Sequence, residues 1–525
     1  MELKNIMATC FEQVAFFFTG GDPKEQSSFL QRAKQLREQS YDREILVKVL
    51  EDYHKHLGAD AKTFENLALL KREDSLAIVT GQQAGFLTGP LYTLYKALTT
   101  IQLAEIQSKE LGCPVVPIFW IASEDHDWIE IQQTVVLDRE GKPFVCRIPG
   151  EGGGRSIGRV GVPSWEEIFP QLESAFPESE FRTEVLQKLE RFTHLANNLG
   201  EWFALILQWL LKDQGLIFFD PLLPEFKRLA APIYEKILRS HVQVREAFDR
   251  RTTEWQTLGQ KPQINLKGEE VNLFIEEPQR RALLWKADAF NLRGNKESFT
   301  LDQLCSLLHD EPERFSPNVL TRPIVQDYLL PTLAYIPGPG ELNYWAQLGE
   351  VFQVLGYNMP VLFPRLSAVV LTPAWHKALE TEQLSVEQVY QGLSAVKERN
   401  VRELDDFDIE GSFSRARLEI EETYTKLSHL AKLQANIPEL LHQNQVKVNG
   451  QLDYLESKIW QAQKKRNEGS LKHFHVLENA LAPKGIKQER LLNPLNFVVR
   501  FGPHFVEKLA ELTLNPDFKE QVVLL

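Results

Sequence analysis

Five consecutive polar residues, Ser123-Glu124-Asp125-His126-Asp127, follow closely on the apolar segment Pro114–Trp120. Three carboxylates and an imidazole so close together could transfer protons or hold a metal ion. His126 is the best candidate for a general base or a metal ligand because an imidazole titrates near neutral pH, and Glu124 and Asp127 are the further catalytic candidates. The alternative is that the acidic residues only cap the next segment, but five polar residues in a row exceed what a cap needs.

A second group of potential ligands lies in a glycine-rich stretch, residues 75–110. The pattern predicts a short buried strand at Leu76–Val79, a loop with Gly81, Gly85 and Gly89, and a helix from about Leu91 to Glu110. The start of this helix would direct unpaired N–H groups at a ligand, so the loop could bind an anion or a nucleotide. The alternative is that the loop is only a tight turn between the strand and the helix. The stretch matches neither the dinucleotide fingerprint nor the Walker motif.

The third group lies between residues 316 and 367. Arg322 could form a two-pronged contact with a carboxylate or phosphate, and its alternative role is a buried ion pair with Asp327. Gly338 and Gly340 flank a proline just before an expected helix, Glu341–Val354, which would again present helix N–H groups. A further strand and loop place Arg365 at a strand end.

These groups require an α/β fold whose parallel strands bring them to one edge. We expect an N-terminal helical segment over residues 1–70, a core in two halves over 71–140 and 311–400, and an inserted region over 141–310. The strand Gly215–Asp220 could belong to the core sheet, although it lies within the insertion. Its place is not decided by the pattern.

Apolar residues between positions 411 and 470 recur at steps of three and four, which predicts an antiparallel helical hairpin with coiled-coil spacing. Such an arm packs on the core or on a second subunit, and we expect a homodimer. The basic run 464–466 is a solvated helix end or a phosphate contact. Residues 471–525 would pack on the core or on the arm.

Composition excludes several classes of function. The chain has 59 basic and 72 acidic residues, a formal charge of −13 that opposes binding to nucleic acid. No apolar run could span a membrane and the start does not resemble a signal peptide, so we expect a cytoplasmic protein. The four cysteines form no C-x-x-C pair, and His54 and His56 are expected to be solvated, so we assign no metal.

Several longer motifs resemble a known family, the bacillithiol biosynthesis cysteine-adding enzymes (BshC type). The similarity covers nearly the whole chain. It rests on Thr80–Gly85, Thr88–Pro90, Phe119–Asp127, Ser316–Val319, Arg322-Pro323, Gln326-Asp327, Gly338–Glu341, Pro364-Arg365 and Gln488–Arg490.

The resemblance implies a Rossmann-like core similar to class I aminoacyl-tRNA synthetases, with connecting-peptide insertions and a coiled-coil dimerisation arm. It also implies a reaction that joins L-cysteine to glucosaminyl-malate to give bacillithiol, with ATP or another nucleotide as activating agent. The sequence lacks the H-x-G-H and K-M-S-K-S signatures of those synthetases, so the alternative is a binding or scaffold protein without ligase activity.

Beside the catalytic candidates, we expect two sets of binding residues. The expected substrate-binding residues are Gln82, Gln83, Thr88, Gly89, Trp120, Ser123, Asp125, Arg322, Gln326, Asp327, Gly338, Gly340, Glu341, Tyr344 and Arg365, and the nucleotide-binding candidates are Lys464, Arg466, Arg490 and Asn493.

Overall fold

The structure, a computed structural model, describes residues 3–266, 268–295, 297–469 and 471–525. The chain forms two compact units. The first comprises Met1–Thr372 and Gln488–Leu525, and the second comprises Pro373–Lys487.

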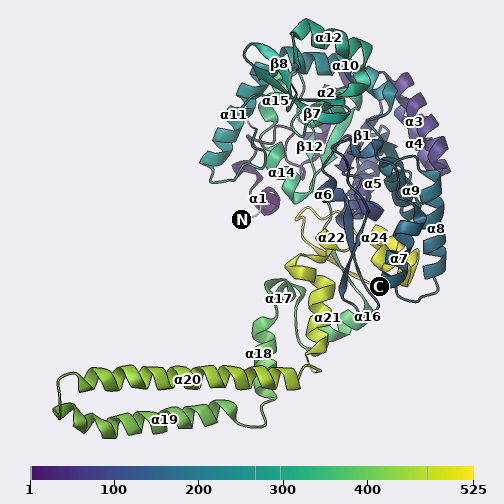
Figure 1. Ribbon diagram of the computed structural model, residues 1–525. Helices are drawn as coiled ribbons and strands as arrows, with labels where there is room; N and C mark the ends of the chain where they lie inside the picture. Colours follow the sequence, from purple (N-terminus) through teal and green to yellow (C-terminus); the bar gives the residue numbers. More distant parts are fainter. Residues whose placement is uncertain (1–2, 267, 296, 470) are drawn as a thin grey trace. The chain divides into compact units, whose positions relative to one another are not determined.

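A five-stranded parallel sheet lies at the centre of the first unit (Figure 1). Its strands are short, apolar and almost wholly buried, as is typical of strands covered on both faces. The sheet confirms the predicted Rossmann-like core, and it places the strand near residue 217 at one edge, beside β2. The spatial order is β12 (Val361–Leu362), β11 (Thr332–Ile336), β1 (Leu76–Gln82), β2 (Val115–Ile121) and β5 (Ile217–Phe219).

The order of the strands creates a switch point at β1. From β1 the chain moves outward through β2 to β5, and it later returns to the opposite side of β1 with β11 and β12. Open α/β sheets bind their ligands at the carboxyl ends of the strands at such a point.

Helices cover both faces of this sheet. Side chains alternate along β1, so that Ala77 and Val79 face α3 and α4, whereas Leu76 and Ile78 face α2 and α5. The helix after the glycine-rich loop begins at Tyr92, close to the predicted start. The bounds are α1 (Leu3–Thr9), α2 (Gln26–Arg37), α3 (Arg43–Leu57), α4 (Ala61–Leu70) and α5 (Tyr92–Leu111).

One histidine of α3 is part of the core, so the prediction that it is solvated is wrong. His54 donates from Nδ1 to the carbonyl of Leu50 at 2.8 Å, and its Nε2 accepts from the N–H of Phe218 in β5 at 2.9 Å. Burial lowers the pKa of His54 to about 4, which keeps the ring neutral.

Insertions before and after β5 build the walls around the sheet's carboxyl edge. The inserted region contains helices and short strands, and a second, antiparallel sheet has the order β10-β6-β7-β8-β9. The helices are α6 (Trp128–Ile131), α7 (Trp165–Ala175), α8 (Arg182–Leu195), α9 (Leu199–Leu210), α10 (Pro224–Arg239), α11 (His241–Thr257) and α12 (Leu301–Asp310). The strands are β3 (Gln133–Leu137), β4 (Pro143–Arg147), β6 (Glu270–Glu277), β7 (Gln279–Lys286), β8 (Ala289–Leu292), β9 (Ser298–Phe299) and β10 (Phe315–Pro317).

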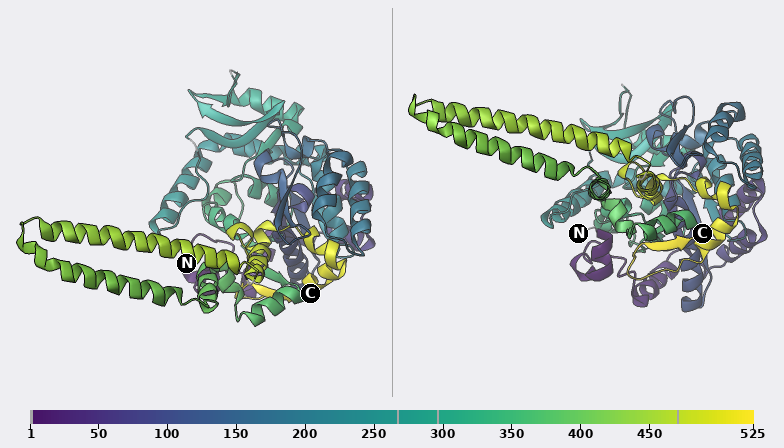
Figure 2. Two further views of the ribbon diagram at one scale, coloured as in Figure 1. Left: turned by 60° about the horizontal axis from the view of Figure 1, so that its bottom comes forward. Right: turned by 90° about the horizontal axis from the view of Figure 1, so that it is seen from below.

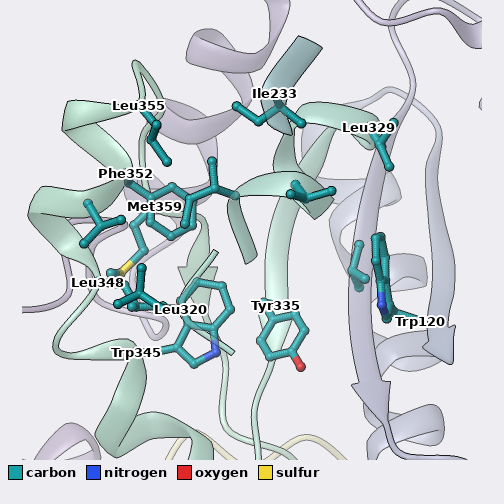
Figure 3. Close-up of a cluster of buried hydrophobic side chains, with 14 of the residues drawn as sticks. Trp120, Ile233, Leu320, Leu329, Tyr335, Trp345, Leu348, Phe352, Leu355 and Met359 are labelled. Carbon is teal, nitrogen blue, oxygen red and sulfur yellow. The ribbon is translucent and has the colours of Figure 1, made fainter. Parts of the chain in front are cut away.

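Aromatic side chains connect the sheet to α13 (Arg322–Leu329), α14 (Pro339–Trp345) and α15 (Gly349–Val354). Trp120 stacks on Phe219 with ring centroids 4.5 Å apart, and Tyr335 lies 4.9 Å from Trp345. Figure 3 shows Trp120, Tyr335 and Trp345 among buried aliphatic side chains. The single helix expected over Glu341–Val354 is instead two short helices, α14 and α15, separated by a turn.

The second unit contains the predicted helical arm. Helices α19 (Ile409–Leu427) and α20 (Ile437–Arg466) run antiparallel and side by side (Figure 2), and Arg417 joins them through an ion pair to Asp453 at 2.7 Å. Helix α20 passes through Gly450 without interruption. The other helices are α16 (Pro373–Thr381), α17 (Val386–Gln391), α18 (Ser394–Glu403) and α21 (Lys472–Leu481).

The last part of the chain returns to the first unit. Strand β14 (Gln521–Leu524) pairs in parallel with β13 (Ala368–Leu371). Three helices precede it: α22 (Gln488–Leu491), α23 (Leu495–Phe501) and α24 (His504–Ala510). Throughout the described part of the chain, no helix is both long and apolar enough to span a bilayer.

Candidate functional site

A cavity of about 550 Å³ lies at the carboxyl ends of β1, β2 and β11, at the switch point. Its lining brings together nine of the residues predicted from the sequence: Gln82, Gln83, Trp120, Glu124, Asp125, His126, Arg322, Glu341 and Tyr344. The insertion contributes Phe274 and Arg280 to the same wall.

Two acidic residues of the polar cluster face this cavity, each held by a different partner. Glu124 forms a buried ion pair with Lys227 of α10, whose ammonium also donates to the carbonyl of Phe315 at 2.8 Å. Asp125 accepts from the Gln83 amide at 2.5 Å and from the N–H of His126 at 2.7 Å. Burial lowers the pKa of Lys227, and the charge of Glu124 opposes this shift.

Two further members of the cluster, Ser123 and Asp127, lie outside the cavity. Ser123 donates its hydroxyl to the buried Asp220, and Asp127 caps α6 by accepting from the N–H of Glu130 at 3.3 Å. Neither is part of the cavity lining. The capping interpretation therefore applies to Asp127, and the expected contact of Ser123 with substrate is replaced by a structural hydrogen bond.

His126 contacts a residue that sequence reasoning missed. Arg280 of β7 places Nη1 3.0 Å from Nδ1 of His126, and its Cζ lies 3.8 Å from the centroid of the Phe274 ring. Burial and the positive charge of Arg280 both lower the pKa of His126, and Asp125 opposes them. No local pattern could reveal this pair, because 154 residues separate its members.

The second glycine-rich turn positions Glu341. Its carboxylate accepts from the N–H of Gly338 at 2.7 Å and from the Tyr335 hydroxyl at 2.8 Å, and it pairs with the ammonium of Lys96. Although burial opposes ionisation, Lys96 and these hydrogen bonds hold the pKa of Glu341 below its ordinary value. Gly338 and Gly340 shape the turn and do not line the cavity.

Lys96 was also missed by the sequence analysis. Its ammonium donates to the carbonyl of Gly81 at 2.8 Å and to the side chain of Gln82 at 2.9 Å, and it lies behind the cavity wall. Burial lowers its pKa against the pull of Glu341. Lys96 therefore connects the two glycine-rich turns.

Arg322 lies in the cavity without an acidic partner among the described residues. Its Nη1 donates to Gln326 at 3.0 Å, its Nη2 has no hydrogen-bond partner in the described part of the chain, and its Cζ lies 5.3 Å from the centroid of the Tyr335 ring. The alternative role of Arg322, an ion pair with Asp327, is wrong, because Asp327 pairs with Arg32 of α2 in the core. Gln326 and Asp327 are buried and lie outside the cavity lining.

A smaller chamber of about 200 Å³ shares Gln82 and Gln83 with the main cavity. Thr88, Gly89 and Arg490 line it. The hydroxyl of Thr88 is buried without a partner among the described residues.

The start of α5, next to this chamber, is held by the C-terminal segment. The N–H of Leu91 donates to the carbonyl of Leu492, and the Asn493 amide donates to the carbonyls of Leu87 and Gly89, at 2.9, 2.8 and 2.9 Å. Part of the predicted anion cradle is thus used within the protein, and Asn493 holds the loop in place.

Three remaining candidates have other surroundings. Arg365 is buried and forms two hydrogen bonds to the carboxylate of Glu489, at 2.9 and 2.8 Å, so it is a structural residue outside the cavity. Lys464 and Arg466 belong to the last turn of α20 in the second unit, where Arg466 lies 4.9 Å from the ring of Phe407. Within the described residues no group of three His, Cys, Asp or Glu side chains could hold a metal ion.

Comparisons with known proteins cover nearly the whole length of the chain. Residues 4–366 match the family model for the bacillithiol biosynthesis BshC N-terminal Rossmann-like domain, and residues 368–525 match that for the BshC C-terminal coiled-coil domain. A solved structure titled a putative arginyl-tRNA synthetase, from Campylobacter jejuni, covers 82% of this chain and 100% of that chain at 11% identity, and its TM-score of 0.25 is too low to support an argument.

Similar proteins named "Putative cysteine ligase BshC" come from several bacteria. The protein from Symbiobacterium thermophilum is 33% identical over 96% of this chain and 94% of its own length. Those from Desulforamulus reducens and Bacillus cereus are 31% and 32% identical, over 98% and 95% of this chain and 96% and 94% of their own lengths. With both family models matched, this chain belongs to the bacillithiol biosynthesis BshC family.

Proposed function

We propose that this protein is a ligase that joins the carboxyl group of L-cysteine to the amine of glucosaminyl-malate, the last step of bacillithiol biosynthesis. The observation that carries the proposal is the charge pattern of the main cavity. Arg322, one of the two arginines of the lining, has no acidic partner among the described residues, and the carboxylates of Glu124 and Asp125 lie in the same lining. The names of its relatives as cysteine ligases support the choice of reaction.

The two kinds of charge suit the two ends of the amino-sugar substrate. The malate carboxylates would bind Arg322, because a guanidinium holds a carboxylate through two parallel hydrogen bonds. The amine would lie near Asp125 or Glu124, which can accept its proton. A volume of about 550 Å³ falls within the range of small-molecule sites.

Amide formation from a free carboxylate is unfavourable in water, so the carboxyl of cysteine must be activated. ATP or another nucleotide is the expected activating co-substrate. Arg490, in the first unit, lines the smaller chamber and remains a candidate for contact with a nucleotide. Lys464 and Arg466 of α20, in the second unit, are separate candidates. Such a biosynthetic ligase would work in the cytoplasm on metabolites made there.

The test is a reconstitution with the pure protein, L-cysteine, glucosaminyl-malate and a panel of nucleoside triphosphates, followed by mass spectrometry. Formation of the cysteinyl amide with one nucleotide supports the ligase. Tight binding of glucosaminyl-malate in calorimetry, with no product under any nucleotide, would instead support the scaffold alternative. Omitting cysteine or the nucleotide supplies the matched blanks.

A further inference from the structure

The contact between Arg280 and His126 determines which nitrogen of the imidazole carries a proton. A guanidinium has only N–H donors and no acceptor. Since Nη1 of Arg280 lies 3.0 Å from Nδ1 of His126, Nδ1 must supply the lone pair. The proton of the neutral ring then resides on Nε2.

Arg280 cannot turn away from this position easily. Its Nε donates to the hydroxyl of Ser316 at 2.9 Å, its Nη2 donates to the carbonyl of Pro317 at 2.6 Å, and its plane lies against Phe274. The side chain is only 6% exposed. Two hydrogen bonds and a ring contact therefore fix the direction of Nη1 toward the imidazole.

We propose that Arg280 is a positioning residue that holds His126 as a neutral Nε2–H hydrogen-bond donor toward the cavity, and that His126 is not the general base. His126 lines the cavity, and Nε2 has no protein partner among the described residues. Such a donor suits the oxygen of the cysteine carboxyl group, which gains negative charge when the amine attacks. This role rests on the proposed ligase reaction.

The reaction step balances with carboxylates already in the cavity. The amine nitrogen forms a bond to the activated carboxyl carbon, and the carbonyl electron pair moves to the oxygen that accepts from His126. The amine proton goes to Asp125 or Glu124. The carbonyl then re-forms as the bond to the phosphate leaving group, which the nucleoside triphosphate supplied, breaks.

The charged groups around the ring are consistent with a neutral imidazole. Arg280 is the nearest, Oδ1 of Asp125 lies 3.7 Å from Nδ1, and Asp127 and Glu276 act from farther away. Burial and Arg280 outweigh these three carboxylates and lower the pKa of His126. Protonation of Nδ1 would also have to break the bond from Arg280.

Two substitutions of His126 separate a donor from a base. A glutamine amide can donate from about the position of Nε2 but cannot accept a proton at neutral pH, whereas leucine can do neither. We expect kcat of His126→Gln to stay within about tenfold of the wild type and that of His126→Leu to fall by about 10²–10³-fold. Equal, large losses in both variants, with folding intact, would overturn the proposal.

A spectroscopic test does not depend on activity. In the wild-type protein with ¹⁵N-labelled histidine, correlation spectra from about pH 6 to 8 should show His126 as the neutral Nε2–H tautomer throughout. His126→Gln identifies the signal by its loss. An Nδ1–H signal, or titration near the ordinary histidine pKa, would overturn the proposal even if Arg280 variants failed to fold.

Substitution of Arg280 tests its part directly. Arg280→Met should raise the pKa of His126, and it should lower kcat more than it changes KM. Arg280→Lys should partly restore the pKa of His126 and kcat. The neighbouring Arg281→Met is the matched control, because Arg281 contacts the carbonyl of Arg293 instead. An unchanged tautomer and pKa of His126 in a folded Arg280→Met protein would contradict the positioning role.

If the wild type makes no product with any nucleotide, the ligase proposal fails, while the spectra still decide the tautomer of His126.

Discussion

Arg322 should determine how tightly the malate carboxylates bind, and replacing it by lysine tests this with little disturbance of the fold. Gln326, one helical turn away, accepts a hydrogen bond from its guanidinium, and no carboxylate among the described residues forms an ion pair with it. A bound carboxylate would therefore meet a cation that has no competing acidic partner there.

The expected magnitude follows from the hydrogen bonds that lysine cannot make. A charge-assisted hydrogen bond contributes about 1.5–3 kcal/mol. Lysine keeps the positive charge but cannot donate the second of the two parallel hydrogen bonds to a carboxylate. Arg322→Lys should thus weaken binding of glucosaminyl-malate by about 10- to 100-fold. Loss of the charge-assisted hydrogen bond to Gln326 should cost about 1.5–3 kcal/mol of folding stability.

Isothermal titration with glucosaminyl-malate measures the affinity, and thermal unfolding of the same preparation measures the stability. Arg239→Lys is the control, since Arg239 is exposed on α10 and pairs with Glu235. Unchanged affinity in a folded Arg322→Lys protein would refute the reasoning and make Arg322 a structural residue. If Arg322 recognises the malate moiety, the ratio of wild-type to Arg322→Lys affinity should be the same for free malate as for glucosaminyl-malate.

Three further predictions concern assembly and stability. The arm formed by α19 and α20 should make the protein a homodimer, so light scattering at micromolar concentration should give the mass of two chains, and a single-chain mass would contradict this. Arg365→Lys should lower the free energy of unfolding in urea by about 1.5–3 kcal/mol, because lysine cannot donate twice to the buried Glu489, and an unchanged value would show that the pair contributes nothing. Burial raises the pKa of Asp220 from 3.8 to about 6. Between these two pH values the folded state therefore binds more protons than the unfolded state. The contribution of Asp220 to the free energy of unfolding should thus fall by roughly 3 kcal/mol as the pH rises from about 4 to 6. Asp220→Asn should remove that part of the slope in unfolding experiments, and an identical slope in both proteins would refute the assignment.

The sequence alone determined the parallel core, the helical arm and the neighbourhood of the site. Short apolar segments followed by glycines or polar residues are local signals, and so is the spacing of apolar residues in α19 and α20. Because parallel strands end at one edge of a sheet, the residues after β1 and β2 were expected to meet Arg322, and Gln82, Asp125 and Arg322 do line one cavity.

Only the tertiary structure decided which partner each charged residue has. Glu124 pairs with Lys227, Glu341 with Lys96, and Asp327 with Arg32, over sequence separations of 103, 245 and 295 residues. Helical and strand periods carry information about neighbours within one or two turns, and they carry none about which distant cation will be buried beside a carboxylate.

The same limit applies to the chemistry of the histidines. Sequence spacing suggested a solvated His54 and a His126 free to act as a base, yet an N–H from β5 contacts the first and a guanidinium from β7 contacts the second. The protonation of an imidazole depends on the donors and acceptors around it. In this protein those groups come from strands that lie far along the chain and become neighbours only when it folds.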